Sequence, residues 1–450
     1  MTTTYTRDYW ESALSTLKLE GRLFIGGDYR PALSGETFTR PRPMDGKPGT
    51  PLARGVGADI DTAVGSARAA FESGVWRKQE PLEKKKVMLR WAELIRAHAE
   101  ELAVLETLDV GKPVLASLNV DVRLCADGIQ YYGEMIDKQY DEIAPTGPNA
   151  RALVRKVPLG VIGVITPWNY PMIIDAWKLG PAIAAGNSVV LKPAEQSSLS
   201  ALRLAALAVE AGLPAGVFNV VTGYGEDAGK PLALHMDVDM IAFTGSTEVG
   251  KLIMGYAAQS NVKRVALELG GKSPIVVFED ADLDAAASAA AWGCFYNAGE
   301  TCHASTRLLV QRSVQEKLIA KIEAVTASDI ALAHPFEPSS QIGALIDEAH
   351  MEKVLGMIAA GEREGAKRVF GAERVLSETG GFYISPGVFI DMTNDMSLAR
   401  QEIFGPVLAV IPFDTEEEAL RLANDTIYGL AGAVFTKDMD RAHRVSEAIH

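Results

Sequence analysis

Short apolar runs alternate with stretches of helical periodicity between residues 160 and 268. The apolar runs suit strands buried on both faces and occupy residues 161–165, 188–191, 217–221, 240–243 and 265–267. Helices are predicted between them, ending at residue 185 and covering 200–211, 226–235 and 248–258. This repetition predicts a parallel sheet with right-handed crossovers, which binds ligands at the carboxyl ends of its strands.

A second α/β series follows residue 270. Its predicted strands occupy residues 274–278, 307–310, 407–411 and 432–435, and its helices lie near 313–325 and 347–360. The sequence therefore predicts an α/β protein with two lobes and a cleft between them.

The pattern before the first sheet is less regular. Residues 20–60 are rich in Gly, Pro and polar residues and predict a strand-and-loop entry. A helical period indicates one helix over 81–110 and a second over 114–138. Residues 139–158 carry Pro and Gly at their centre and predict a hairpin.

Length and charge narrow the class of protein. A chain of 450 residues is too long for one ordinary core, so two or more domains are expected. The formal net charge of -14 disfavours nucleic acid and anionic membranes as partners, because both attract basic surfaces. No apolar run approaches the length of a membrane span, and the start of the chain lacks the apolar core of a signal peptide.

The chain has three cysteines, Cys125, Cys294 and Cys302. Three cannot all pair, and so few in a long chain indicate a reducing compartment. No His or Cys cluster has metal-ligand spacing, so no metal site is expected. These features predict a cytoplasmic enzyme.

Cys302 ends a loop of small residues, and Glu268 ends a predicted strand before Gly270 and Gly271. A thiolate attacks carbonyl carbon, and a carboxylate activates water to release the product. Each residue has a plainer reading, since a lone cysteine is more often inert and a glutamate before two glycines often just ends a strand. Cys125 and Cys294 lie in predicted helices and are expected to serve packing.

Polar residues follow three of the predicted strands. Asn169 lies in a turn between two prolines. Its side chain is either an oxyanion donor or that of an ordinary turn residue. Lys192 and Glu195 follow the second strand and suit ribose hydroxyls, although a surface ion pair is the alternative. A carboxylate there repels a 2′-phosphate and so favours NAD over NADP. The stretch 243–250 forms a strand, a glycine turn and a helix start that suits phosphate, without the usual GxGxxG fingerprint.

Together these segments resemble the aldehyde dehydrogenase superfamily over nearly the whole chain. The resemblance rests on the segments 167–169, 192–195, 243–246, 267–272, 299–304 and 402–406. It implies an aldehyde dehydrogenase-like fold with a Rossmann-type cofactor domain over 1–138 and 159–267. It also implies a catalytic α/β domain over 268–450 and a β-hairpin oligomerisation element over 139–158.

The resemblance also implies a mechanism. Cys302 would attack the aldehyde, the Asn169 amide and the Cys302 N–H would hold the oxyanion, and hydride would pass to NAD. Glu268 would then activate water to hydrolyse the thioester. The implied cofactor contacts are Ile165, Thr166, Pro167, Trp168, Lys192, Glu195, Gly225, Gly229, Phe243, Thr244, Gly245, Ser246, Val249, Leu269, Gly270, Glu402 and Phe404.

The implied substrate tunnel is slim and partly apolar. Its walls would be Leu124, Tyr170, Ile174, Trp177, Tyr296, Thr301 and His303. Asp121 and Asp175 are expected near its entrance, as attractors of a cationic substrate tail or as solvated helix residues. Small aldehydes are the expected partner, and a homodimer or homotetramer is the expected assembly.

Within the superfamily, the segments 22–27, 106–109, 177–181 and 306–310 resemble bacterial γ-glutamyl-γ-aminobutyraldehyde and guanidinobutyraldehyde dehydrogenases. An aliphatic or amino aldehyde is therefore the expected substrate. Two alternatives stay open. One is a CoA-acylating semialdehyde dehydrogenase, which Glu268 disfavours. The other is a truncated, inactive family member that serves as a binding or structural protein, because the family continues beyond the position of His450.

Overall fold

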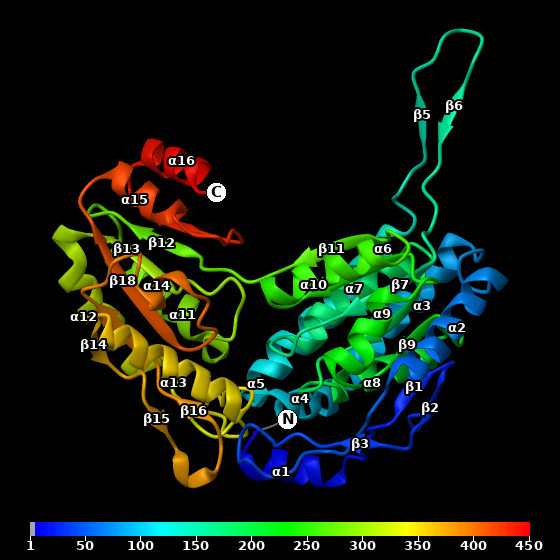
Figure 1. Ribbon diagram of the computed structural model, residues 1–450, viewed down its shortest axis with the longest axis horizontal. Helices are drawn as coiled ribbons and strands as arrows, with labels where there is room; N and C mark the ends of the chain where they lie inside the picture. The colour runs from blue at the N-terminus through cyan, green and yellow to red at the C-terminus, as the bar shows by residue number, and fades with distance from the viewer. Residues whose placement is uncertain (1–4) are drawn as a thin grey trace.

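Two α/β lobes face each other in the computed structural model, which describes residues 5–450 (Figure 1). The first four residues lie outside this range. The prediction that the start of the chain is not a signal peptide covers these residues in part. Within the described range, no helix combines the length and apolar character needed to cross a membrane.

A seven-stranded sheet organises the first lobe, in the order β11-β10-β7-β8-β9-β1-β2. The five predicted strands are confirmed as parallel neighbours: β7 (Val161–Ile165), β8 (Ser188–Lys192), β9 (Phe218–Val220), β10 (Met240–Thr244) and β11 (Arg264–Glu268). Every residue of β7 and β8 is buried, as expected of strands covered on both faces. The entry strands β1 (Leu23–Ile25) and β2 (Asp28–Arg30) extend one edge in antiparallel fashion.

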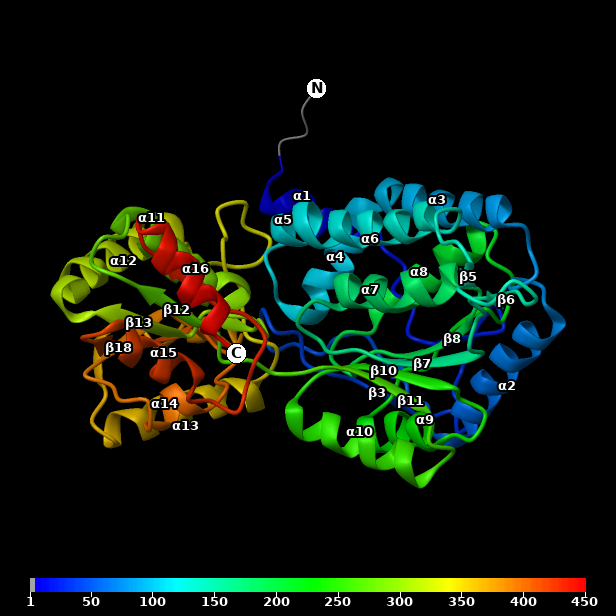
Figure 2. The same ribbon diagram turned by 90° about the horizontal axis from the view of Figure 1, so that it is seen from above.

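Helices cover both faces of this sheet (Figure 2). One face carries α2 (Gly57–Ser73), α9 (Lys230–Leu234) and α10 (Thr247–Gln259). The other carries α3 (Pro81–Ala97), α4 (Ala99–Val110), α6 (Val122–Met135), α7 (Pro171–Ala184) and α8 (Leu199–Glu210). Helix α1 (Arg7–Thr16) and the small strand pair β3 (Thr37–Phe38) and β4 (Leu52–Ala53) complete the lobe.

Two helix predictions need correction. The single helix predicted over 81–110 is two helices, because His98 leaves the helical range (φ -104, ψ 26) and its ring contacts Glu101 at 2.8 Å. The helix predicted over 114–138 contains a π-helical turn, η1 (Ser117–Asp121), between α5 (Val114–Ala116) and α6. The apolar spacing predicted the helical stretches but not these interruptions.

A six-stranded sheet organises the second lobe, in the order β14-β17-β18-β13-β12-β19. The predicted strands are confirmed as β12 (Pro274–Val277), β13 (Arg307–Gln311), β18 (Val407–Phe413) and β19 (Ala433–Phe435). Short strands missed from the sequence are β14 (Lys367–Phe370), β15 (Arg374–Val375), β16 (Tyr383–Ile384) and β17 (Gly387–Ile390). One face packs on α11 (Leu283–Phe295) and α12 (Gln315–Asp329). The other packs on α13 (Glu348–Arg363), α14 (Ser397–Arg400), α15 (Glu416–Asn424) and α16 (Met439–Ala448).

The predicted hairpin is present as β5 (Glu142–Ala144) and β6 (Ala152–Val154), which pair antiparallel and project from the first lobe (Figure 1). The first sheet ends at Glu268 and the second begins at Pro274, so the chain crosses between the lobes over 269–273. The assignment of cofactor, hairpin and catalytic domains stays a prediction.

Arg307 ties this crossing to the second lobe. Its buried guanidinium donates to the carbonyl of Lys272 at 2.9 Å and to those of Leu422 and Ala423 at 2.8 and 2.7 Å. Burial lowers the pKa of Arg307 to about 10. This one side chain therefore connects the crossing segment, β13 and the end of α15.

We expect Arg307→Met to destabilise the fold by about 3 kcal/mol or more, because several buried carbonyls lose a charged donor. Urea unfolding monitored by circular dichroism measures the loss. Arg312→Met is the matched control, since Arg312 is exposed and pairs with Asp414 at the surface. Equal midpoints for the two variants would show that Arg307 does not hold this junction.

Candidate active site

The loop that carries Cys302 lies between α11 and β13 and has an unusual backbone. Asn297, Ala298 and Gly299 all take positive φ angles, of 53, 54 and 75. Left-handed conformations in two consecutive non-glycine residues are costly and persist only where the surroundings enforce them. The loop is therefore held by its contacts.

Buried amide side chains supply these contacts. The Asn297 Nδ2 donates to the carbonyl of Asn169 at 3.1 Å and to that of Glu300 at 3.2 Å. The Asn169 Nδ2 donates in return to the carbonyl of Glu300 at 3.0 Å. Asn169 follows β7 in the first lobe, so these bonds join the two lobes at the cysteine loop.

Glu300 fixes the other side of the loop. Its carboxyl accepts a hydrogen bond from the Ile346 N–H at 2.9 Å and lies 3.8 Å from the His350 Nε2. Burial raises the pKa of Glu300 well above its ordinary value, which favours the neutral acid. The sequence stretch 297–302 was conspicuous, yet nothing in it assigned these structural tasks to Asn297 and Glu300.

One cavity of about 270 Å³ opens on one side of Cys302. Nine of the predicted cofactor residues line it together with Asn169: Pro167, Trp168, Thr244, Gly245, Ser246, Leu269, Gly270, Glu402 and Phe404. His350 and Lys353 also line it and were missed, because α13 carries no motif that marks them. The ring of His350 lies 5.4 Å from that of Trp168, edge to face.

The start of α10 borders this cavity. Ser246 caps the helix, since its Oγ accepts from the Val249 N–H at 3.2 Å. The first N–H groups of a helix have no partner within it, so they are free to bind an anion. The predicted phosphate role thus suits the turn backbone, while the Ser246 hydroxyl is engaged in the cap.

Glu402 reaches across from the second lobe. The Gly271 N–H donates to its carboxylate at 3.0 Å, and a Cβ on Gly270 would collide with that carboxylate. Only glycine at 270 therefore admits Glu402 to this position. Burial raises the pKa of Glu402.

Other predicted cofactor residues lie outside this cavity. The buried Lys192 Nζ pairs with the Glu195 carboxylate at 3.1 Å, at the carboxyl end of β8. Gly225 and Gly229 bound the π-helical turn η2 (Gly225–Gly229), and Lys192 passes beside Gly229. Ile165, Thr166 and Phe243 are buried at strand ends, and Val249 is exposed on α10. A helix start with free N–H groups, a Lys–Glu pair and aromatic rings are groups that suit the phosphates, ribose and nicotinamide of a dinucleotide.

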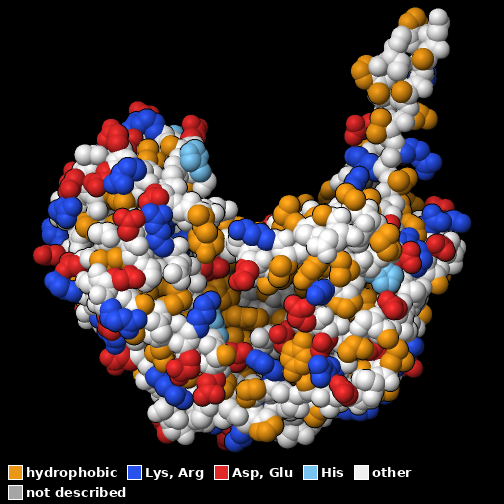
Figure 3. Space-filling model, viewed as in Figure 1, with side chains coloured by type: hydrophobic (Ala, Val, Ile, Leu, Met, Phe, Trp, Pro, Cys, Tyr) orange, Lys and Arg blue, Asp and Glu red, His pale blue; other side chains and the backbone are white. Residues whose placement is uncertain are grey.

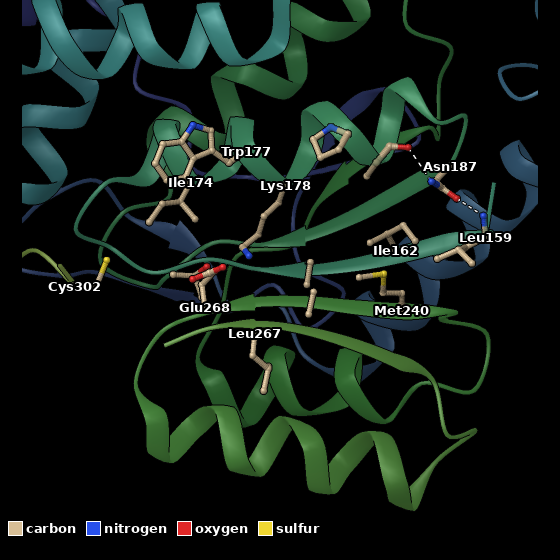
Figure 4. Close-up of a pocket in the computed structure, with 15 residues that line it drawn as sticks. Leu159, Ile162, Ile174, Trp177, Lys178, Asn187, Met240, Leu267, Glu268 and Cys302 are labelled. Carbon is tan, nitrogen blue, oxygen red and sulfur yellow. Dashed lines mark hydrogen bonds between the residues drawn. The ribbon is translucent and has the colours of Figure 1, made fainter. Parts of the chain in front are cut away.

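A second cavity, of about 570 Å³, extends from Cys302 and Glu268 along β7 and β10 beneath α7 (Figure 4). Its walls are mostly apolar and include Ile174 and Trp177. Figure 4 shows Lys178 and Glu268 directed to the same end of this cavity. The Lys178 Nζ donates to the Phe243 carbonyl at 3.2 Å, and burial lowers its pKa to about 8. In the space-filling view, hydrophobic side chains line the hollow between the lobes (Figure 3).

Cys302 borders both cavities and is the half-buried thiol of the chain. Burial raises its pKa, and the Glu402 and Glu268 carboxylates raise it further. Its Sγ lies 3.9 Å from the His303 Nδ1. Cys125 and Cys294 are fully buried in α6 and α11, as predicted for packing residues.

The remaining predicted tunnel residues divide into two groups. The Tyr170 hydroxyl lies 2.8 Å from the Thr301 Oγ1, directly before Cys302. The Lys112 Nζ lies 4.0 Å from the centre of the Tyr170 ring and supports it from behind. Neither cavity is lined by the five predicted tunnel residues other than Ile174 and Trp177, which are Leu124, Tyr170, Tyr296, Thr301 and His303. Leu124 is 41% exposed on α6.

The expectation for Asp121 and Asp175 is wrong. Both are fully buried, not at a tunnel entrance and not solvated. Asp121 pairs with Lys112 at 2.7 Å inside the first lobe. Their helices turn these faces inward, so neither carboxylate is available to a substrate tail.

Residues 29–450 match the model of the aldehyde dehydrogenase family. The two-lobed fold and the match define an oxidoreductase that oxidises aldehydes with NAD. The chain belongs to the aldehyde dehydrogenase family, as its motifs predicted. Among described residues no group of three or more His, Cys, Asp or Glu side chains is placed to hold a metal ion.

Three relatives illustrate the similarity. NADP/NAD-dependent aldehyde dehydrogenase PuuC of Escherichia coli (strain K12) is 48% identical over 98% of this chain and 88% of its own length. A structure of indole-3-acetaldehyde dehydrogenase with NAD+ superposes with a TM-score of 0.98 at 50% identity, over 99% of this chain and 90% of that one. The γ-glutamyl-γ-aminobutyraldehyde dehydrogenase of Burkholderia cenocepacia J2315 gives 0.96 at 51% identity, with the same coverage of both chains.

The amide bonds of Asn297 yield a direct prediction. Asn297→Gly removes both donors but tolerates the positive φ, so we expect turnover to fall roughly 10²-fold while the fold survives. Asn297→Ala adds backbone strain at φ 53 and should lose more activity and thermal stability. NADH formation at saturating aldehyde, with thermal unfolding of each variant, gives the comparison. Unchanged turnover in both variants would show that these bonds do not position Cys302.

Proposed function

We propose that this enzyme oxidises a slim aliphatic or amino aldehyde to the free carboxylic acid through a thioester on Cys302. The observation that carries the proposal is the position of Cys302, which borders the cavity lined by the predicted cofactor residues on one side and the apolar cavity with Glu268 on the other. A thiol at that junction reaches both a bound aldehyde and a bound nicotinamide.

The first step is addition of the Cys302 thiolate to the carbonyl carbon. A C–S bond forms, and the carbonyl π electrons move to the oxygen. The Asn169 amide has two N–H donors, and only one is used by the Glu300 carbonyl. The second donor and the Cys302 backbone N–H hold the resulting oxyanion.

When bound, the nicotinamide cofactor supplies the hydride acceptor. Glu268 then accepts a proton from water, the oxygen of that water adds to the thioester carbon, and the C–S bond breaks to release the acid. Glu268 is exposed at the end of β11, where it contacts both the cavity and solvent. This access suits a base that must pass protons to bulk water.

The positions of the strand-end residues support the following cofactor contacts. Lys192 and Glu195 bind the adenosine ribose, the turn at Gly245 and Ser246 binds the pyrophosphate, and Glu402 binds the nicotinamide ribose. Phe404 and Trp168 pack beside it. Contacts from Ile165, Thr166, Gly225, Gly229 and Val249 complete the assignment. The Glu195 carboxylate repels a 2′-phosphate, so NAD is the preferred cofactor.

The substrate class rests on the cavity and on a relative. Ile174 and Trp177 line an apolar cavity that leads to Cys302, which suits the apolar chain of an aliphatic or amino aldehyde. A relative with 51% identity is a γ-glutamyl-γ-aminobutyraldehyde dehydrogenase. We assign the same class of aldehyde to this chain, with recognition of the chain by apolar contact and without Asp121 or Asp175.

The assembly proposal rests on the hairpin. Ile143 and Leu153 on β5 and β6 are 66% and 70% exposed, which is costly for apolar strands in a monomer. A homodimer or homotetramer that covers this hairpin removes the cost. The three free thiols suit the cytoplasm as its location.

The catalytic proposal predicts two different variant phenotypes. Cys302→Ala should lose at least about 10³-fold in turnover with NAD across an aldehyde panel that includes propanal, 4-aminobutanal and its γ-glutamyl amide. Glu268→Gln should instead form one NADH per site in a fast burst and then turn over slowly, because the thioester forms but hydrolyses poorly. Stopped-flow absorbance of NADH separates the two.

Product analysis completes that test. Free acid is expected with or without coenzyme A, and acyl-CoA as the main product would contradict the hydrolytic role of Glu268. Well-folded wild-type protein that forms no NADH with any member of the panel would contradict the dehydrogenase assignment of the site.

The cofactor proposal predicts a change in preference. Glu195→Gln removes the charge but keeps the shape, so the ratio of kcat/KM for NADP to that for NAD should rise by at least about tenfold. Glu210→Gln, an equal change of charge at the exposed last residue of α8, is the matched control. Equal ratios in both variants would show that Glu195 does not face the adenosine ribose.

A further inference from the structure

The surroundings of Cys302 disfavour the ionised, thiolate form of its side chain. The charged and basic side chains that line the two cavities beside Cys302 come from four places: Glu268 on β11, Lys178 on α7, Glu402 before β18, and Lys353 with His350 on α13. The two carboxylates raise the pKa of the thiol, and burial raises it more. The site therefore favours the thiol, although the proposed reaction needs the thiolate.

Two of these neighbours, Lys178 and His350, are engaged elsewhere. Lys178 donates to the Phe243 carbonyl, and the His350 Nε2 lies 2.6 Å from the Phe404 carbonyl. Glu268 has no hydrogen bond to the thiol. Within residues 5–450, the single side chain at hydrogen-bonding distance from the Sγ is His303, whose Nδ1 lies 3.9 Å away.

His303 is exposed, although it follows Cys302 directly in the chain. A neutral imidazole carries one ring nitrogen without a proton, and that nitrogen can accept the proton of a thiol beside it. Exposure lets the ring pass that proton on to water. The backbone N–H groups of Cys302 and His303 also favour the thiolate, since both lower the thiol pKa against the effect of burial.

We propose that His303 is the proton acceptor that activates Cys302, forming a thiolate–imidazolium pair, while Glu268 acts on water only. This assignment rests on the proposed function and adds a residue to its machinery. The Sγ–H bond breaks and the proton moves to the His303 Nδ1. The sulfur electron pair then forms the C–S bond to the aldehyde carbon, and the imidazolium releases its proton to solvent.

The pairing also gives His303 a part in the second half of the reaction. Hydrolysis of the thioester expels Cys302 as a thiolate. An imidazolium beside the leaving sulfur stabilises that thiolate and so assists C–S cleavage. The same residue thus acts on the sulfur in both directions, and Glu268 remains committed to the water.

Alkylation of the protein by iodoacetamide tests the pair without cofactor or aldehyde. Cys125 and Cys294 are fully buried, so labelling of folded protein reports Cys302, and Cys302→Ala sets the background. His303→Gln keeps a polar side chain of similar size but removes the base. At about pH 6.5 the wild type should react at least about tenfold faster than His303→Gln, and near pH 10 the two rates should converge within about twofold.

Two controls make the result specific. His443→Gln removes an exposed histidine on α16 and should follow the wild-type profile. The ultraviolet thiolate absorbance of wild type minus Cys302→Ala, titrated with pH, needs no histidine variant and should show thiolate below pH about 8. Parallel profiles for wild type and His303→Gln, or thiolate absorbance only at alkaline pH, would overturn the pair.

The outcome is separable from that of the proposed function. NADH formation by the wild type together with a His303→Gln profile like that of the wild type overturns the pair and leaves the dehydrogenase assignment standing. Acid-shifted alkylation in a protein that forms no NADH supports the pair and overturns the proposed function instead.

Discussion

The site depends on one constraint, the reciprocal amide bonds that hold the cysteine loop in a left-handed backbone. Asn297 and Asn169 each donate to the Glu300 carbonyl, and Asn297 also donates to the backbone of Asn169. Since Asn169 belongs to the first lobe and Asn297 to the second, the same bonds that position Cys302 also position the lobes at the cleft. A buried, satisfied polar network of this kind stabilises a single geometry, because its loss would leave several carbonyls unpaired.

The lobes supply different parts of the chemistry through this junction. The first sheet ends its parallel strands at the cleft, which brings Asn169, Lys192, the turn at Gly245 and Glu268 to one edge. The second lobe contributes Cys302 on a loop and Glu402, whose carboxylate lies against Gly270 and accepts from the Gly271 N–H. Glycine at 270 allows the carboxylate to approach, and glycine at 271 allows the Cys302 carbonyl to do so. The paired glycines after Glu268 are therefore steric requirements of the junction.

Local pattern predicted most of the architecture. The buried runs of both sheets, the hairpin and the chemical residues at strand ends all appear in sequence as short, strongly apolar segments followed by polar turns. The pattern failed where the signal is weak or non-local. Helix α2 is rich in alanine, β14 to β17 are short, and the break at His98 depends on a single residue.

The site residues also divide into those with a local sequence signal and those without one. Cys302, Glu268 and Asn169 stand in recognisable segments, whereas Asn297 and Glu300 act through backbone bonds that no spacing reveals. His350 and Lys353 come from a helix far along the chain and reach the cavity only through folding. Asp121 and Asp175 were misjudged because helical periodicity does not tell which polar face turns inward, and the buried Lys112 beside Asp121 became visible only in three dimensions.

Intact-protein and peptide mass spectrometry of Glu268→Gln, quenched with acid after mixing with NAD and aldehyde, tests the central claim most directly. The account predicts a mass increase equal to the acyl group of the aldehyde, located on the peptide that contains Cys302. It also predicts no such adduct in Cys302→Ala or without NAD. A variant that forms NADH while every cysteine peptide stays unmodified would contradict a reaction through a thioester on Cys302.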